Sequence, residues 1–188
     1  MPLNTIIYDT FQPSSSNLSK RIVTLLANHY PLIKTCIWET YWLHGWMNLH
    51  PLSNWIIVET EREVLESVFY RLTDISKAVF LTPDRKVVDL YVLQYHQAII
   101  IKPLLSGALT LPVGNFTTAA PEKMLVDIVA EPNLFRAQQG EIDLIYSNAF
   151  REIPIDQAKM LRYAQRRRRY EPVFNLIPPE YRLPKIIG

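Results

Sequence analysis

The chain has 188 residues, of which 48% are hydrophobic and 20% charged, and this balance is typical of one globular domain with a sizeable core. Its formal net charge is only +2, and its one cysteine, Cys36, excludes an internal disulfide and a cysteine-rich zinc site. It has neither a signal-peptide pattern nor an apolar stretch of the ~18 residues that a membrane span requires, so we expect a cytoplasmic protein without membrane contact.

The first half of the chain predicts helices that alternate with short strands. Residues 1–15 are polar and contain two prolines, which predicts an N-terminal arm or an edge strand. The serines at 14–16 supply N-cap candidates for a helix that Pro31 ends, and Thr60 with Glu63 has the spacing of a capping box. The other predicted elements are a strand over 35–38, a helix over 39–49, a strand over 54–60, a helix over 61–72, a strand over 77–81 and a short helix or turn over 83–91.

The second half begins with β-type segments and then becomes helical. Residues 97–105 are the most β-like segment, and two smaller strands over 109–111 and 113–118 flank a hairpin-type Gly-Asn turn. We therefore expect one domain over residues 1–188, of the α/β or α+β class, with a mixed β-sheet of four to six strands and packed helices. After this sheet we expect a helical C-terminal portion over 121–130, 141–151 and 155–169, and an extended, proline-rich tail over 171–188.

A basic helix near the C-terminus is the first candidate for a binding site. From Arg151 onward the chain carries nine Lys or Arg and four Asp or Glu, a net of +5, which leaves −3 for the first 150 residues. Cations clustered with aromatic rings can contact nucleic acid or an acidic protein, whereas the alternative is a solvated helix end that complements the helix dipole. The predicted surface has one face with Lys159, Arg162, Arg166 and Arg169, and an adjacent face with Tyr163, Arg167 and Tyr170.

A second candidate is a stripe of tryptophans. Trp38, Trp42 and Trp46 recur at every fourth position, so they share one face if residues 38–49 are helical. Such a face is either a stacking interface or part of the core. Core burial is the favoured interpretation, because large aromatic side chains are usually buried.

Motifs for metal binding and catalysis are missing from the sequence. The histidines lack the spacings of zinc sites and there is no Gly-rich phosphate loop, so we expect no metal and no cofactor. A restriction-type nuclease would need Glu-x-Lys on a strand, but Lys102 of the predicted strand has isoleucine two positions before it. A nucleotidyltransferase would need Gly-Ser before Asp-x-Asp, which does not occur. The acids from Glu59 to Glu66 are therefore interpreted as a charged helix start and its exposed face.

One segment resembles a known family. Residues 118–127 read Thr-Ala-Ala-Pro-Glu-Lys-Met-Leu-Val-Asp, which resembles the Pro-Glu-Arg/Lys-x-Leu-x-Asp element of AbiEi-like antitoxins and transcriptional regulators from phage-defence toxin–antitoxin systems. The likeness extends over about residues 18–170 and is similar to an uncharacterised bacterial branch of that group. The element is carried by Pro121, Glu122, Lys123, Leu125 and Asp127.

The resemblance implies a partner and a role. Members of that family usually join a winged helix, which binds operator DNA, to a C-terminal domain required for antitoxin action. Nothing before residue 34 is long enough for a winged helix, so the chain resembles the second domain alone. The expected role is a non-enzymatic regulatory or antitoxin-like domain that opposes a nucleotidyltransferase-type toxin through protein contacts, with nucleic-acid contact through the basic helix as a further role. The alternative is an enzyme of degenerate nuclease or nucleotidyltransferase type.

Two acids of the family element have predicted structural roles. Glu122 and Asp127 lie five residues apart and therefore do not share a helical face. We expect Glu122 to hold the start of its helix and Asp127 to pair with an arginine.

Overall fold

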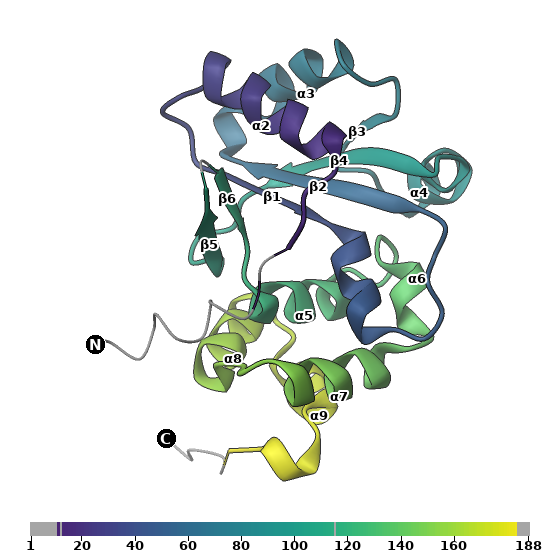
Figure 1. The fold of residues 1–188 in the computed structure, drawn as a ribbon, viewed down its shortest axis with the longest axis vertical. Coiled ribbons are helices and arrows are strands. Elements are labelled where there is room, and N and C mark those ends of the chain that lie inside the picture. Colours follow the sequence, from purple (N-terminus) through teal and green to yellow (C-terminus); the bar gives the residue numbers. More distant parts are fainter. Residues whose placement is uncertain (1–10, 12, 115, 184–188) are drawn as a thin grey trace.

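A computed structural model of the chain describes residues 11, 13–114 and 116–183. Its centre is a four-stranded sheet in the order β1-β2-β4-β3, with helices packed on both faces (Figure 1). β1 (Thr35–Glu39) runs antiparallel to β2 (Asn54–Thr60), and β2, β4 (Gln97–Pro103) and β3 (Val79–Leu81) are parallel. This mixed sheet, followed by a helical C-terminal portion, confirms the predicted fold class.

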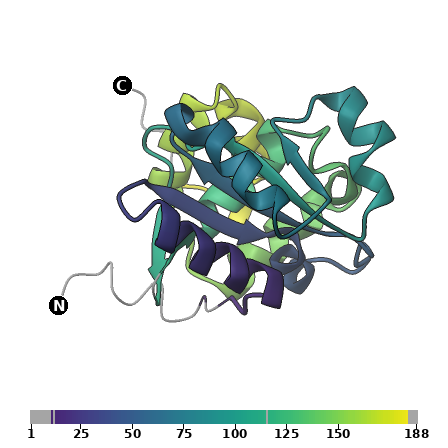
Figure 2. The same ribbon diagram turned by 90° about the horizontal axis from the view of Figure 1, so that it is seen from above.

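The strands are apolar on both sides because both faces of the sheet are covered. Successive side chains of a strand point to opposite faces, so Ile56 of β2 belongs to one core and Ile57 to the other. The first core lies under α2 (Asn17–His29) and α3 (Leu65–Thr73), which lie side by side over the sheet (Figure 2). As predicted, a serine caps α2: the Ser16 side chain accepts a hydrogen bond from the first turn.

The second core lies between the sheet and the C-terminal helices, which Figure 1 shows on the side opposite α2 and α3. The helix nearest the sheet is α5 (Pro121–Ala130), and its residues from Pro121 to Ile128 are all buried. A helix buried on every side has to pair each of its charged residues with another residue. The other helices of this layer are α6 (Arg136–Gln139), α7 (Ile142–Glu152), α8 (Gln157–Arg166) and α9 (Tyr170–Leu176).

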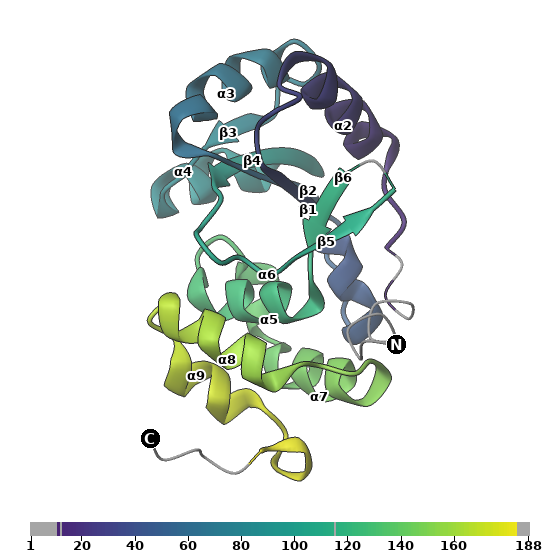
Figure 3. The same cartoon turned by 90° about the vertical axis from the view of Figure 1, so that its left-hand side faces the viewer.

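A β-hairpin lies beside the outer edge of β1 (Figure 3). It consists of β5 (Thr110–Val113) and β6 (Phe116–Ala119), as the sequence predicts, and Gly114 at its turn has a φ of 57°. The Thr118 hydroxyl donates a hydrogen bond to the Ile37 carbonyl at 2.7 Å, which ties the hairpin to the sheet. On the opposite side of the sheet, β3 and β4 are joined by α4 (Arg85–Leu90).

The predicted helix over 39–49 is a shorter 3₁₀ helix, η1 (Thr40–Trp46). Trp38 is part of β1, so the three tryptophans do not form a stripe on one helix. All three are nevertheless buried, which confirms their interpretation as core residues.

The predicted capping box at Thr60 is wrong. Thr60 ends β2, where its backbone carbonyl accepts from the Leu104 N–H, and its hydroxyl donates to the Lys34 carbonyl. The sheet thus occupies the groups that a helix cap would need. The chain instead continues through a 3₁₀ turn, η2 (Arg62–Val64), and α3 begins at Leu65 without a side-chain cap.

The predicted extended tail is also corrected. Residues 170–176 form α9, and a further 3₁₀ turn, η4, covers Pro179–Tyr181. Pro172 lies in the first turn of α9, where a missing N–H breaks no helical hydrogen bond. Val173 and Ile177 have no exposed surface, so burial fixes this segment on the core. Most of the predicted N-terminal arm and the last five residues, 1–10, 12 and 184–188, lie outside the described residues.

Candidate functional site

The centre of the molecule holds six charged side chains that pair with one another beside α5. Glu59 and Lys102 come from neighbouring strands, where they are register partners near the carboxyl ends of β2 and β4. The others come from α5, the residue after it and the end of α8. We call this group the buried charge cluster: Glu59, Lys102, Lys123, Asp127, Glu131 and Arg167.

Lys123 lies at the centre of this cluster and has no exposed surface. Its Nζ is 2.6 Å from Glu59 Oε2 and also pairs with Asp127. Burial by itself would lower the pKa of Lys123, but the carboxylates of Asp127 and Glu59 outweigh burial and raise that pKa well above its usual value. Lys123 is therefore a permanent cation, which without these partners would be an uncompensated buried charge.

Glu131 joins the two remaining cations at the edge of the cluster. Lys102 and Arg167 both pair with Glu131, and Arg167 Nε lies 3.6 Å from Asp127 Oδ1. Burial by itself would raise the pKa of Asp127, but Lys123, Lys102 and Arg167 lower it below its usual value. The side chain of Glu131 is 25% exposed, so the cluster meets solvent on this side.

The carboxylates of the cluster are all paired with its cations, so they do not form an open site for a ligand. Each of its three carboxylates contacts at least two of its three cations. Tyr163 adds a hydrogen bond from its hydroxyl to Asp127 Oδ1 at 3.0 Å, and burial, followed by Asp127, raises the pKa of that phenol. Within the described residues, no three His, Cys, Asp or Glu side chains converge as they would around a metal ion. The ion pairs of the cluster therefore join the sheet to the helical layer.

The family element lies in the first turns of α5. Pro121 occupies the first turn and Asp127 pairs with Arg167, both as the sequence predicts. Glu122 also lies in the first turn of α5, and its carboxylate in addition accepts a hydrogen bond from the Asp156 backbone N–H, at the start of α8, at 2.8 Å. The buried residues of the element are Pro121, Glu122, Lys123, Leu125 and Asp127.

Replacing Glu122 by glutamine is expected to raise the thermal stability at pH 7. Burial raises the pKa of Glu122 in spite of the Asp156 N–H, so the folded state resists ionisation more than the unfolded state. The unmodified chain therefore loses stability as the pH rises from the pKa of Glu122 in the unfolded state through its pKa in the folded state. Glutamine keeps the acceptor oxygen without the charge, so the variant does not suffer this loss. Melting curves should show the gain at pH 7 and a smaller gain below pH 4. A loss at pH 7 would contradict this account.

A second charged feature is the arginine surface, which we define as Arg162, Arg166, Arg168 and Arg169. Arg162 and Arg166 lie one turn apart on α8, and the other two follow in the turn after it. All four are exposed, and within the described part of the chain none forms an ion pair with a carboxylate. The surface therefore presents four cations to solvent that have no carboxylate partner among the described residues.

The turn that ends α8 is of a type in which glycine is the usual residue. The Arg169 N–H bonds to the Ala164 carbonyl at 2.8 Å and the Arg168 N–H to the Gln165 carbonyl at 3.0 Å, which are the two hydrogen bonds of a Schellman motif. Arg168 takes the left-handed position of this motif with a φ of 55°. A residue with a Cβ pays about 1 kcal/mol for that conformation. Arginine thus stands where glycine would be more stable.

Replacing Gly107 by alanine is expected to lower stability by about 1 kcal/mol and to move Arg166. Gly107 has a φ of 71°, and the Arg166 Nη1 donates to its carbonyl at 3.2 Å. A Cβ at this glycine would lie 1.6 Å from that Nη1, so the guanidinium has to leave. Thermal unfolding measures the loss, with Gly45→Ala as the control, since a Cβ there meets nothing within 4 Å. Equal stability of both variants would contradict the prediction that a side chain at Gly107 strains the backbone and displaces Arg166.

Comparison with known proteins places the chain in a family. A family of unknown function (DUF6577) matches residues 5–181. The chain belongs to this family. Searches of curated proteins and of solved structures found no match to the chain. Within the described residues, no helix is both long enough and apolar enough to cross a bilayer.

The predicted binding residues of this family member divide into two groups. Tyr163 is buried and Arg167 is held in the buried charge cluster, so neither lies on the predicted outer surface. Tyr170 is half-buried and stacks on Phe174 with ring centres 6.0 Å apart. The side chains near the outer surface are Lys159, which pairs with Asp156 at 3.3 Å, Arg162, Arg166 and Arg169. Arg169 lies beyond the end of α8 and not on the same helical face.

Three residues of the buried charge cluster are not among the predicted site residues. The sequence predicts that Glu59 belongs to an exposed helix start, but Glu59 is 3% exposed and belongs to β2. The other two are Lys102 and Glu131. One signal was present: Ile-Ile-Val-Glu and Ile-Ile-Ile-Lys both place a charge after three apolar residues, as expected when strands end at a common charged site.

Proposed function

We propose that this domain is a non-enzymatic, antitoxin-like binding module whose arginine surface contacts an acidic surface of a nucleotidyltransferase-type toxin. The observation that carries the proposal is Arg168, an exposed arginine kept in a left-handed conformation that glycine would occupy at lower cost. Strain of this kind is typical of positions selected for something other than stability. The resemblance of residues 118–127 to AbiEi-like antitoxins supplies the class of partner.

An acidic protein is preferred over nucleic acid as the partner. The aromatic ring of Tyr163, which would stack on bases, is buried, and the net charge of the chain is only +2. We therefore expect a titration with duplex DNA to stay flat. Salt-dependent binding in the micromolar range would favour the nucleic-acid role instead.

One observation favours the alternative of an enzyme. Glu59 and Lys102 lie near the carboxyl ends of parallel strands, which is where α/β enzymes place their active sites. Their side chains are 4% and 9% exposed, and both are paired, so a substrate would have to displace these ion pairs. This burial is the reason for preferring the binding module.

The proposal predicts a nucleotidyltransferase gene beside the gene of this chain, and it is tested by growth of cells that express that enzyme with and without the chain. We expect the chain to restore growth and the double variant Arg166→Ala/Arg169→Ala to weaken the complex about tenfold, which is ~1.4 kcal/mol. The double variant Arg62→Ala/Lys86→Ala removes as much charge from exposed positions elsewhere and should behave as the unmodified chain. The lack of such a neighbouring gene, or growth that the chain fails to restore, would contradict the proposal.

A further inference from the structure

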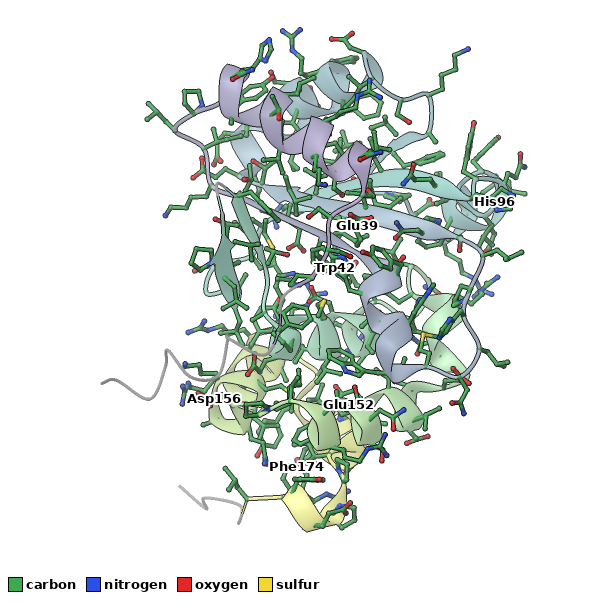
Figure 4. All side chains as sticks on the ribbon, viewed as in Figure 1. Glu39, Trp42, His96, Glu152, Asp156 and Phe174 are labelled. Atoms are coloured by element: carbon green, nitrogen blue, oxygen red, sulfur yellow. The ribbon has the colours of Figure 1, made fainter. Side chains whose placement is uncertain are left out.

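A pocket of about 450 Å³ lies beside η1, away from both charged features. Its wall is formed by the segment before α2, by η1 and the loop after it, and by the end of α7. Figure 4 labels Trp42 and Glu152, which line it from η1 and from α7. Six of its eleven lining residues have aromatic rings: Phe11, Tyr41, Trp42, His44, Trp46 and His50.

These rings are fixed against one another. Phe11 packs edge-on against Trp42 and is stacked on Trp46, with ring centres 6.3 and 6.4 Å apart. His44 stacks on His50 at 4.8 Å with an angle of 12° between the rings. The walls are therefore preorganised, and the electron-rich faces of such rings attract cations.

The charge of the pocket also favours a cation. Among the lining residues that the structure describes, Glu152 is the one acidic or basic side chain apart from the two histidines. Its pairing with Arg151, at 3.6 Å between exposed groups, is weak. Burial, followed by the nearby His50, lowers the pKa of His44, which disfavours the cationic form of that imidazole. The carboxylate of Glu152 therefore favours a cation over an anion at this pocket.

We propose that this pocket is a binding site for an organic ammonium group, held by the aromatic walls and by the Glu152 carboxylate. The group is either that of a small free amine or that of a lysine side chain on a partner. The two sources share the same chemistry at the pocket, and the affinity of a blocked lysine relative to that of a simple amine separates them.

The test is an NMR titration of the intact chain, read from the indole N–H signals of its four tryptophans. The probes are n-butylammonium and tetramethylammonium chloride, with tert-butanol as a neutral control and sodium acetate as an anionic one. We expect both cations to shift the signals of Trp42 and Trp46, which line the pocket, and to leave those of Trp38 and Trp55 unchanged. Shifts of similar size with tert-butanol or acetate, or no shift with the cations, would overturn the proposal.

Two variants define the role of the carboxylate. Glu152→Gln should weaken binding of both cations about threefold, as expected for one charge at a half-exposed site. Asp143→Asn removes an exposed carboxylate from the same helix outside the pocket and should leave binding unchanged. Equal affinities of the two variants would overturn the assignment. N-acetyl-lysine methylamide should bind at least as tightly as n-butylammonium if the source is a protein side chain, and more weakly if it is a free amine.

Discussion

Replacing Lys123 by methionine is expected to lower the free energy of unfolding by about 3–5 kcal/mol, which is the usual cost of breaking a buried ion pair from one side. The side chain has no exposed surface and lies between the carboxylates of Glu59 and Asp127. Methionine fills a similar volume, but it leaves these carboxylates close together without the cation that separates them. Urea unfolding at pH 7 measures the loss.

A second variant separates the charge from the packing. The double variant Lys123→Met/Asp127→Leu removes a cation and an anion together, and Glu59 keeps Lys102 at 3.8 Å. We expect it to be more stable than Lys123→Met alone, because neutral replacement of a buried pair costs less than an unpaired charge. If Lys123→Met is within about 1 kcal/mol of the unmodified chain, the pairing described for Lys123 is wrong.

Replacing Asp127 by asparagine is expected to cost about 3 kcal/mol at pH 7 and much less in acid. Lys123, Lys102 and Arg167 lower the pKa of Asp127 in the folded state. A depressed folded pKa gives stability that is complete above the unfolded pKa, about 3.9, and is lost as pH falls through the folded pKa. The difference between the two proteins should therefore narrow steadily below pH 4.

Urea unfolding at a series of pH values from 7 to 3 measures this difference. Asp143→Asn serves as the control, because Asp143 is an exposed acid on α7 and lies outside the buried charge cluster. Its difference from the unmodified chain should stay near zero throughout. A difference for Asp127→Asn that does not change with pH would show that the Asp127 carboxylate is not stabilised by the surrounding cations.

Local patterns were sufficient to predict most elements of the fold. The serine cap of α2, the apolar runs of β2 and β4 and the turn at Gly114 are all set by residues close in sequence. The predictions fail where contacts between distant segments, and not local patterns, determine the local structure. Thr60 looks like a helix cap, but its backbone is used by the sheet, and α9 forms in spite of Pro172 because Val173 and Ile177 reach the core.

The buried charge cluster depends on contacts between distant segments, so the sequence could reveal it only in part. Asp127 was expected to pair with an arginine, and Arg167 is that arginine. Glu59 and Lys102 meet because β2 and β4 are paired in one particular register, which no local pattern specifies. Helical periodicity predicts one face with Lys159, Arg162, Arg166 and Arg169, but α8 ends at Arg166. The left-handed conformation of Arg168 beyond that end is not visible in the periodicity.

Arg168→Gly tests most directly whether the arginine surface serves binding. Relief of the left-handed conformation should raise the free energy of unfolding by about 1 kcal/mol, while loss of the cation should weaken the complex with the proposed toxin partner. Thr82→Gly is the matched control, because Thr82 is also exposed and has a φ of 40°. Thr82 directly follows β3 and is not part of the arginine surface. The Thr82→Gly variant should therefore gain stability and keep full binding. The measurement is the dissociation constant together with the unfolding free energy of both variants. We expect both variants to become more stable and only Arg168→Gly to bind more weakly. Unchanged binding by a more stable Arg168→Gly would contradict the proposed role of the arginine surface.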